Sequence, residues 1–247
     1  MLGGGHNFAV DRAVGDEIER VMPGLRESAR VSRAFLGRAV RYLAGQGIRQ
    51  FLDIGSGIPT VGNVHEVAQA QHPDCRVVYV DHDPVAVAHS ELMLASNDRA
   101  AVVHADMRDP EKILDSPELR GLLDLDEPVG LLMLLMLHWI PDEHGPSELV
   151  GRYRDALAPG SFLALTHVTG DHQGENLAEA TEVIKESRSP DQVTLRTHAE
   201  VSRLFAGFEI VDPGLVGCGE WRPSGPADIA GAAAMNMLVY AGIGRKN

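Results

Sequence analysis

The chain has 247 residues, which is enough for one large domain with a well-buried core. Hydrophobic residues make up 44% of it and charged residues 23%, as in ordinary globular proteins. The formal net charge of -13 makes the surface repel phosphate groups, so nucleic acid and an anionic membrane surface are unfavourable partners.

Predicted helices and strands alternate along most of the chain. Helices are predicted at 11–22, 25–44, 64–70, from 84 onward, and at 147–157, 177–185 and 199–205. Strands are predicted at 50–54, 76–80, 101–104, 129–137, 162–167, 208–211 and 237–243. This alternation predicts an α/β fold, a Rossmann-like doubly wound sheet that is mostly parallel. We expect a single domain over residues 1–247, in which residues 1–47 form an N-terminal helical extension.

Acidic side chains follow three consecutive predicted strands, where parallel sheets bind ligands. Asp53 begins a turn with Gly55 and Gly57, and glycines let the backbone approach a ligand closely. Asp81 ends the second strand, where a carboxylate can accept hydrogen bonds from both hydroxyls of a ribose. Asp106 follows the third strand and can accept a hydrogen bond from an adenine amino group. Together the three strand ends predict a nucleoside pocket.

Some polar residues near these strand ends can also be interpreted as helix caps. Asp83 precedes a proline, which is typical of a helix N-cap. Asn63 and Glu66 have the spacing of a capping box, although His65 and Glu66 alternatively face the cleft. One Gly-x-Gly pattern is weak evidence by itself. The order of all three strand ends carries the prediction.

The order Asp53-x-Gly55-x-Gly57, Asp81, Asp106 resembles the class I S-adenosylmethionine-dependent methyltransferases. A closer resemblance is to the actinobacterial S-adenosyl methyltransferase family, formerly a domain of unknown function. Its matching stretches are RAFL at 33–36, QFLDIGSGIPT at 50–60, NVHEVA at 63–68, VVYVDHDP at 77–84 and WRP at 221–223. The resemblance spans nearly the whole chain and is more specific in the first half. It implies a seven-stranded sheet with an antiparallel last strand, and S-adenosylmethionine as the cofactor.

The resemblance also implies which residues contact the cofactor. They are Asp53, Gly55, Ser56, Gly57, Asp81, His82, Asp106 and Met107. The glycine turn would lie against the amino-acid end, Asp81 would hold the ribose, and Asp106 and Met107 would flank the adenine. His82 is expected either to stack on the adenine or to stay exposed. Pro59 stands where the generic pattern often has a third glycine, which fits the closer family.

Candidate catalytic residues follow the fourth and fifth predicted strands. His138 can act as a general base or orient an acceptor, and Trp139 can form a wall of the pocket. His167 is expected to open on the same cleft. Both histidines have an alternative reading as structural polar contacts. We predict no metal site, since the 11 histidines show no His-Glu-x-x-His or cysteine-rich spacing.

The predicted function is methyl transfer from S-adenosylmethionine to an unidentified small molecule. One alternative is a non-catalytic protein that binds S-adenosylmethionine. A nucleotide-cofactor oxidoreductase is a further alternative, but Thr60 stands where its Gly-x-Gly-x-x-Gly fingerprint has a glycine. Asn7, Phe8 and Asp11 are candidate lid residues in the N-terminal extension.

The remaining expectations concern the surroundings of the protein. Cys75 and Cys218 are expected to be free thiols in a reducing compartment. The start of the chain lacks the pattern of an export signal, and no apolar run reaches the roughly 20 residues of a membrane span. We therefore expect a cytoplasmic protein with no membrane or nucleic-acid partner. The sequence leaves the oligomeric state open, a homo-oligomer included.

Overall fold

The computed structural model describes residues 25–58, 62–171, 193–230 and 233–247. The helices expected at 11–22 and 177–185 lie outside the described residues, as do Asn7, Phe8 and Asp11. Pro59 and Thr60 also lie outside them.

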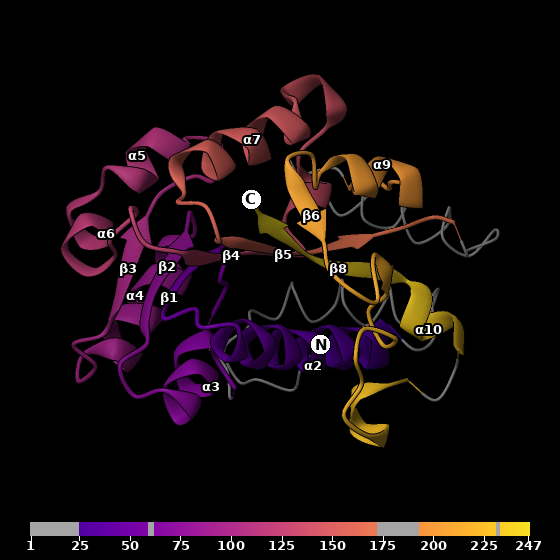
Figure 1. Ribbon diagram of the computed structural model, residues 1–247, viewed down its shortest axis with the longest axis horizontal. Coiled ribbons are helices and arrows are strands. Elements are labelled where there is room, and N and C mark those ends of the chain that lie inside the picture. The colour runs from indigo at the N-terminus through magenta and orange to yellow at the C-terminus, as the bar shows by residue number, and fades with distance from the viewer. Residues whose placement is uncertain (1–24, 59–61, 172–192, 231–232) are drawn as a thin grey trace.

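The described helices and strands follow one another in the predicted alternation (Figure 1). The helices are α2 (Leu25–Gly45), α3 (Val64–Gln71), α4 (Pro84–Leu94), α5 (Pro110–Leu114), α6 (Pro117–Leu122), α7 (Pro146–Ala156), α9 (His198–Arg203) and α10 (Ala233–Met237). Three 3-10 turns are η1 (Leu137–Trp139), η2 (Asp142–His144) and η3 (Pro226–Asp228). The strands are β1 (Gln50–Ile54), β2 (Arg76–Asp81), β3 (Ala100–His104), β4 (Val129–Leu134), β5 (Phe162–Val168), β6 (Phe208–Ile210), β7 (Val216–Gly217) and β8 (Val239–Lys246).

All described strands belong to one sheet, whose order is β3-β2-β1-β4-β5-β8-β6, with β7 beside β8. The first five strands are parallel to one another, and β8 runs antiparallel between β5 and β6. The predicted fold class, a mostly parallel Rossmann-like sheet with an antiparallel last strand, is confirmed. The sheet has eight described strands rather than the seven expected, because the two-residue β7 adds a short pairing to β8.

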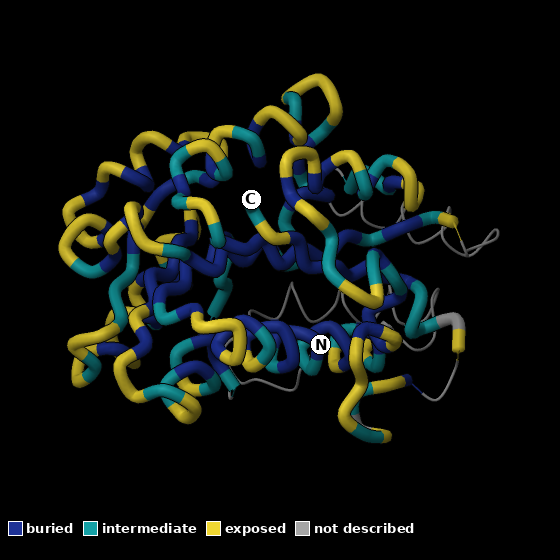
Figure 2. Tube along the Cα trace, viewed as in Figure 1, coloured by how far each residue is buried: buried dark blue, intermediate teal, exposed yellow. Residues whose placement is uncertain are grey.

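Helices cover both faces of the sheet (Figure 1). On one face α2 and α3 pack against it, and on the other α5, α6, α7 and α9 do. Strand β1 contributes to both faces, since Phe51 belongs to the hydrophobic cluster under α2 and Leu52 to the cluster under α7. The sheet is accordingly buried along most of its length (Figure 2). This explains why its central strands are continuous apolar runs rather than alternating ones.

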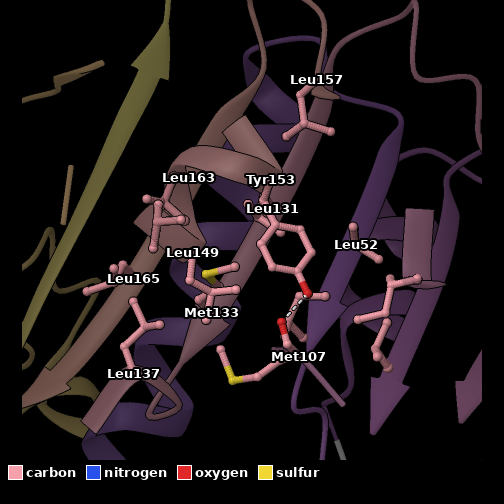
Figure 3. Close-up of a cluster of buried hydrophobic side chains, with 14 of the residues drawn as sticks. Leu52, Met107, Leu131, Met133, Leu137, Leu149, Tyr153, Leu157, Leu163 and Leu165 are labelled. Carbon is pink, nitrogen blue, oxygen red and sulfur yellow. Dashed lines mark hydrogen bonds between the residues drawn. The ribbon is translucent and has the colours of Figure 1, made fainter. Parts of the chain in front are cut away.

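Figure 3 shows the cluster under α7, where Tyr153 lies among leucines of the parallel strands. Its hydroxyl donates a hydrogen bond to the backbone oxygen of Met107 over 2.8 Å. Burial raises the pKa of Tyr153, so this hydroxyl remains a donor at neutral pH. The bond joins α7 to the chain just after β3 and so fixes one side of the region where the strands end.

Some predicted boundaries were wrong. The run expected as a strand at 129–137 ends at Leu134, because Leu135 has a φ of 55° and turns the chain out of the sheet. Its N–H is still held, by the hydroxyl oxygen of Thr166 at 2.8 Å. The last strand was expected from Met237, but Met237 ends α10 and β8 begins at Val239. Apolar periodicity alone does not register such turns.

Helices α5 and α6 were not predicted. Each is short, begins with a proline, and follows an N-cap residue, Asp109 or Ser116, that accepts a backbone hydrogen bond. The Asp-Pro and Ser-Pro pairs were therefore the sequence signal for both.

The segment between β7 and α10 is joined to α2 by a buried arginine. Arg38 donates to the backbone oxygens of Cys218 at 2.7 Å and Trp221 at 2.8 Å. Trp221 is fully buried and packs edge-on against Phe35. Cys75 and Cys218 are both free and buried, as expected for the thiols. No helix among the described residues is long and apolar enough to cross a membrane.

Candidate functional site

A pocket of about 350 Å³ lies at the carboxyl ends of β1, β2 and β3. Its volume is in the range of small-ligand sites. Residues predicted to contact the cofactor form much of its lining, namely Gly55, Gly57, Asp81, His82, Asp106 and Met107. Of the other two, Asp53 lies in β1 just before the glycine turn, and Ser56 lies in the turn between the two glycines. The structure thus brings the three strand ends together as the sequence predicted.

The glycine turn is shaped by left-handed backbone at two positions. Gly55 has a φ of 74° and Gly57 a φ of 65°. The N–H groups of Gly55 and Ser56 both point to the backbone oxygen of Val80, at 2.8 and 3.2 Å, so the turn stays joined to β2. A side chain at Gly55 would overlap the thioether of Met136. Glycine is therefore required there by both backbone conformation and space.

Asp81 is held in the pocket by backbone donors. One carboxylate oxygen accepts the N–H of Gly57 at 2.7 Å, and the other accepts the N–H of Asp83 at 2.9 Å. Each oxygen can accept a further hydrogen bond. Asp81 is 9% exposed and lines the pocket, whereas the neighbouring His82 is exposed. The carboxylate is therefore oriented before any ligand arrives. The N-cap reading of Asp83 is confirmed, since its side chain accepts the N–H of Val85.

Asp53, in β1 just before the glycine turn, is buried, with 6% of its surface exposed. Among the described residues, no donor forms a hydrogen bond with its carboxylate. Burial raises its pKa to about 7, and the nearby charge of Asp81 adds to this, while the guanidinium of Arg33 opposes it. Ser56 is similar, because its buried hydroxyl has no hydrogen-bond partner among the described residues. The Ser56 hydroxyl and the Asp53 carboxylate are therefore the buried polar groups at this strand end that are suited to bind a ligand.

The third strand end is more exposed. Asp106 receives the backbone N–H and the guanidinium of Arg108, and this ion pair lowers its pKa. Met107 is buried, with its backbone oxygen held by Tyr153. Sequence reasoning missed Arg108 as a lining residue, although its place two residues after Asp106 was a usable signal.

The loop after β4 forms the opposite wall. Met136, Trp139 and Ile140 line the pocket facing the glycine turn. The expectation that Trp139 walls the pocket agrees with this lining. Met136 and Ile140 were missed, because the apolar run at 129–137 was interpreted as a continuous strand.

His138 and His167 lie behind this wall rather than in the lining. His138 is 5% exposed, and its ring stands 4.7 Å from that of Trp139 and 5.9 Å from that of His167. Burial, helped by the neighbouring His167 and Arg196, lowers the pKa of His138 to about 3. Its Nδ1 atom has no hydrogen-bond partner among the described residues. His138 is therefore neutral at pH 7.

His167 is fully buried with both ring nitrogens engaged. Nε2 lies 2.8 Å from a guanidinium nitrogen of Arg196, which can only donate, so Nε2 accepts. Nδ1 then carries the proton and donates to the backbone oxygen of Val168 at 2.7 Å. Burial lowers the pKa of His167 to about 4. This geometry favours its structural reading over proton transfer.

The residues after the glycine turn form a separate polar cluster. Glu66 accepts the N–H groups of Gly62 at 2.6 Å and Asn63 at 3.0 Å, so the predicted capping box at the start of α3 is confirmed. His65 lies 2.7 Å from the hydroxyl of Tyr79. His65 therefore packs against the side chain of Tyr79 and does not line the pocket.

The sheet order, the antiparallel β8 and the pocket across three strand ends define a Rossmann-like α/β protein with a ligand site at its carboxyl edge. The sequence profile described as S-adenosyl methyltransferase matches residues 1–247, and the chain belongs to this family. The predicted family and its cofactor, S-adenosylmethionine, are confirmed. No curated protein matches the chain.

Two solved structures resemble the chain over its full length. A DUF574 family protein from Streptomyces avermitilis MA-4680 is 39% identical, with a TM-score of 0.94 over 100% of this chain and 94% of that one. A candidate methyltransferase from Thermobifida fusca YX is 43% identical, with a TM-score of 0.93 over 100% and 91%. At 12% identity, the N-methyltransferase NodS from Bradyrhizobium japonicum WM9 shares only the fold, with a TM-score of 0.54 over 97% and 99%.

Proposed function

We propose that the protein transfers a methyl group from S-adenosylmethionine to a small-molecule acceptor. The orientation of Asp81 is the observation that carries the proposal. Its two oxygens are fixed by the N–H groups of Gly57 and Asp83, and each retains capacity for one more donor at the pocket. That is the arrangement needed to accept the two hydroxyls of a ribose.

The other pocket residues fit the rest of the cofactor. The buried carboxylate of Asp53 and the Ser56 hydroxyl, which has no hydrogen-bond partner among the described residues, suit the amino-acid end, together with Gly55 and Gly57. We assign the adenine end to His82, Asp106 and Met107, which line the same pocket. When bound, the cofactor supplies a methyl group on a positively charged sulfur for direct displacement.

The chain's own contribution to the transfer is to align the acceptor and exclude water. His138 is the candidate for orienting the acceptor from behind the wall, where its ring packs against Trp139 and keeps one nitrogen without a hydrogen-bond partner among the described residues. Because its pKa is near 3, it orients an acceptor better than it removes a proton. We assign His167 the supporting role of holding the wall from behind.

A small molecule is the favoured acceptor because of charge. At -13 the chain disfavours nucleic acid. A protein acceptor is the second candidate, and a protein that binds the cofactor without turnover is the third.

Calorimetry with S-adenosylmethionine, S-adenosylhomocysteine and NAD tests the cofactor assignment. We expect heat from the first two ligands and none from NAD. Heat from NAD alone would overturn the assignment.

Incubation of a cell extract with the protein and methyl-labelled cofactor tests the acceptor. Label is expected among small metabolites. Label confined to macromolecules would refute the small-molecule acceptor, and no transfer to any fraction would favour a binding protein. If small molecules are labelled, His138→Ala follows. A fall in turnover of about 10²–10⁴ would mark a general base, and a change below about tenfold an orienting or structural residue.

A further inference from the structure

The wall loop, residues 135–140, packs on the glycine turn, yet its own sequence does little to hold it there. Leu135 has left-handed backbone, which costs a non-glycine residue roughly 1 kcal/mol or more, and η1 is a single short turn. The N–H groups of Trp139 and Ile140 donate to the backbone oxygens of Met136 and Leu137, at 3.0 and 3.2 Å, but both bonds lie within the loop and do not join it to the rest of the chain. The support must come from elsewhere in the chain.

That support is residues 194–196, which lie far away in sequence. The N–H of Thr194 donates to the backbone oxygen of His138 at 2.7 Å. The guanidinium of Arg196 donates to the backbone oxygens of Leu137 at 2.8 Å and Ile140 at 2.7 Å. Three carbonyls of the wall loop are thus held from one side by a single short segment.

The remaining donors of Arg196 are also used. One goes to Nε2 of His167 at 2.8 Å, and Nε and Nη2 both reach the carboxylate of Asp142, at 3.1 and 2.7 Å. A guanidinium has five N–H donors in a fixed plane, and these contacts account for all five. Arg196 is 3% exposed, so its contacts to the backbone oxygens and to His167 are shielded from competing water, whereas the Asp142 side chain is 76% exposed. Because every N–H donor of Arg196 has an acceptor, its side chain is held in one conformation and can act as a rigid support.

We propose that Arg196 is a positioning residue that holds the wall loop against the cofactor pocket. In this role His167 is the side chain that accepts a hydrogen bond from Arg196 and so fixes its position. The expected effect of Arg196 on cofactor affinity rests on the proposed function, whereas its effect on the position of the loop does not. If the loop occupies the binding position in only a fraction of the molecules, the apparent ligand affinity is the intrinsic affinity multiplied by that fraction. Arg196 thereby sets affinity without touching the pocket.

Acrylamide quenching of tryptophan fluorescence measures the loop without any ligand. Trp139 is half-buried, whereas Trp221, the other tryptophan, is fully buried, so quenching reports mainly on Trp139. In Arg196→Lys, with three donors on a point charge instead of five in a plane, we expect the quenching constant to rise about twofold or more. Affinity for S-adenosylhomocysteine should fall about tenfold or more.

Arg38→Lys is the matched control. Arg38 is also a buried arginine that donates to two backbone oxygens, but those belong to Cys218 and Trp221. This variant should lose stability while Trp139 quenching and ligand affinity stay near wild type. Asp142→Asn should change the quenching constant and the ligand affinity by less than about twofold each, since the Asp142 side chain is 76% exposed and its ion pair is weak.

His167→Leu is the second variant if Arg196→Lys does not fold. It removes one acceptor and leaves the two carbonyl contacts, so a smaller rise in quenching is expected. Equal quenching in wild type and in whichever of these variants folds would overturn the proposal. Equal rises in the Arg196 and Arg38 variants would do the same, because loss of stability would then explain both. If wild type fails to bind S-adenosylhomocysteine, the proposed function fails, while the ligand-free quenching still decides the role of Arg196.

Discussion

At the scale of the residue, the pocket depends on two aspartates in different surroundings. Asp81 has both oxygens held by backbone N–H groups, which fix their orientation. Asp53 is buried beside it without a hydrogen bond from the described residues, and its pKa rises to about 7. Under the proposed function, Asp81 accepts the ribose hydroxyls and Asp53 ionises when the positively charged end of the cofactor binds.

Asp81→Ala is expected to weaken binding of S-adenosylhomocysteine by roughly 1.5–3 kcal/mol, the scale for hydrogen bonds to a charged group. Calorimetry measures the affinity, and circular dichroism checks the fold. Asp109→Ala is the control, since the Asp109 carboxylate likewise accepts a backbone N–H but lies outside the pocket lining. Unchanged affinity in Asp81→Ala would move the ribose contact elsewhere.

Binding of the cofactor is expected to release a proton from Asp53 near pH 7. The positively charged amino group proposed to lie beside it would lower its pKa from about 7, so the bound state holds fewer protons. Affinity should therefore increase as the pH rises from 6 towards 8. Arg33 and Asp81 face the same carboxylate and act in opposite directions on it.

Calorimetry in buffers of different ionisation enthalpy measures this release. Wild type should give buffer-dependent heats at pH 7, and Asp53→Asn should not. Heats that do not depend on the buffer in wild type would contradict the assignment of Asp53.

At the scale of the element, the glycine turn and the wall loop form one packed unit. Gly55 lies under Met136, and the loop that carries Met136 is held by Arg196 on its other side. The turn can approach the loop this closely only because Gly55 has no side chain.

Gly55→Ala is expected to lose stability by roughly 1–2 kcal/mol from left-handed backbone, and more from displacing Met136. Gly47→Ala is the control for backbone strain alone, since Gly47 has a φ of 94° with open space at its Cβ position. Denaturant unfolding of both variants separates the two costs. Met136→Ala in the Gly55→Ala background should recover the steric part; no recovery would show that the overlap is relieved in another way.

At the scale of the whole molecule, buried histidines couple stability to pH. His138 and His167 have pKa values lowered to about 3 and about 4, so the unfolded chain binds their protons first on acidification. Their effect is absent above about pH 6.5 and costs stability as the pH falls from there towards 4. Asp53 acts in the opposite direction between its ordinary range and pH 7, because the folded chain keeps its proton longer.

His138→Gln is expected to reduce the pH dependence of stability by about 1.4 kcal/mol per pH unit between pH 4 and 6, the value for one proton. Urea unfolding at several pH values in that range measures it for wild type and variant. His144→Gln is a suitable control, since His144 is exposed. Parallel curves for wild type and His138→Gln would mean that His138 is protonated in the folded state.

The amino-acid sequence by itself determined the sheet and one edge of the site. Buried parallel strands need continuous apolar runs, and their helices need caps such as Asp83 and Asn63, so both were readable locally. The acids after β1, β2 and β3 were also readable, because carboxyl ends of parallel strands meet at one edge.

Only the tertiary structure decided the other wall and the state of its histidines. The N–H of Leu135 at the turn is held by Thr166 of β5, and the loop beyond it is held by Arg196 from far along the chain. No local pattern marks such contacts. The lowered pKa of His138 depends likewise on burial and on His167 and Arg196, which are neighbours only in the fold. Long-range hydrogen bonds and burial are properties of the packed chain, and periodicity and spacing do not contain them.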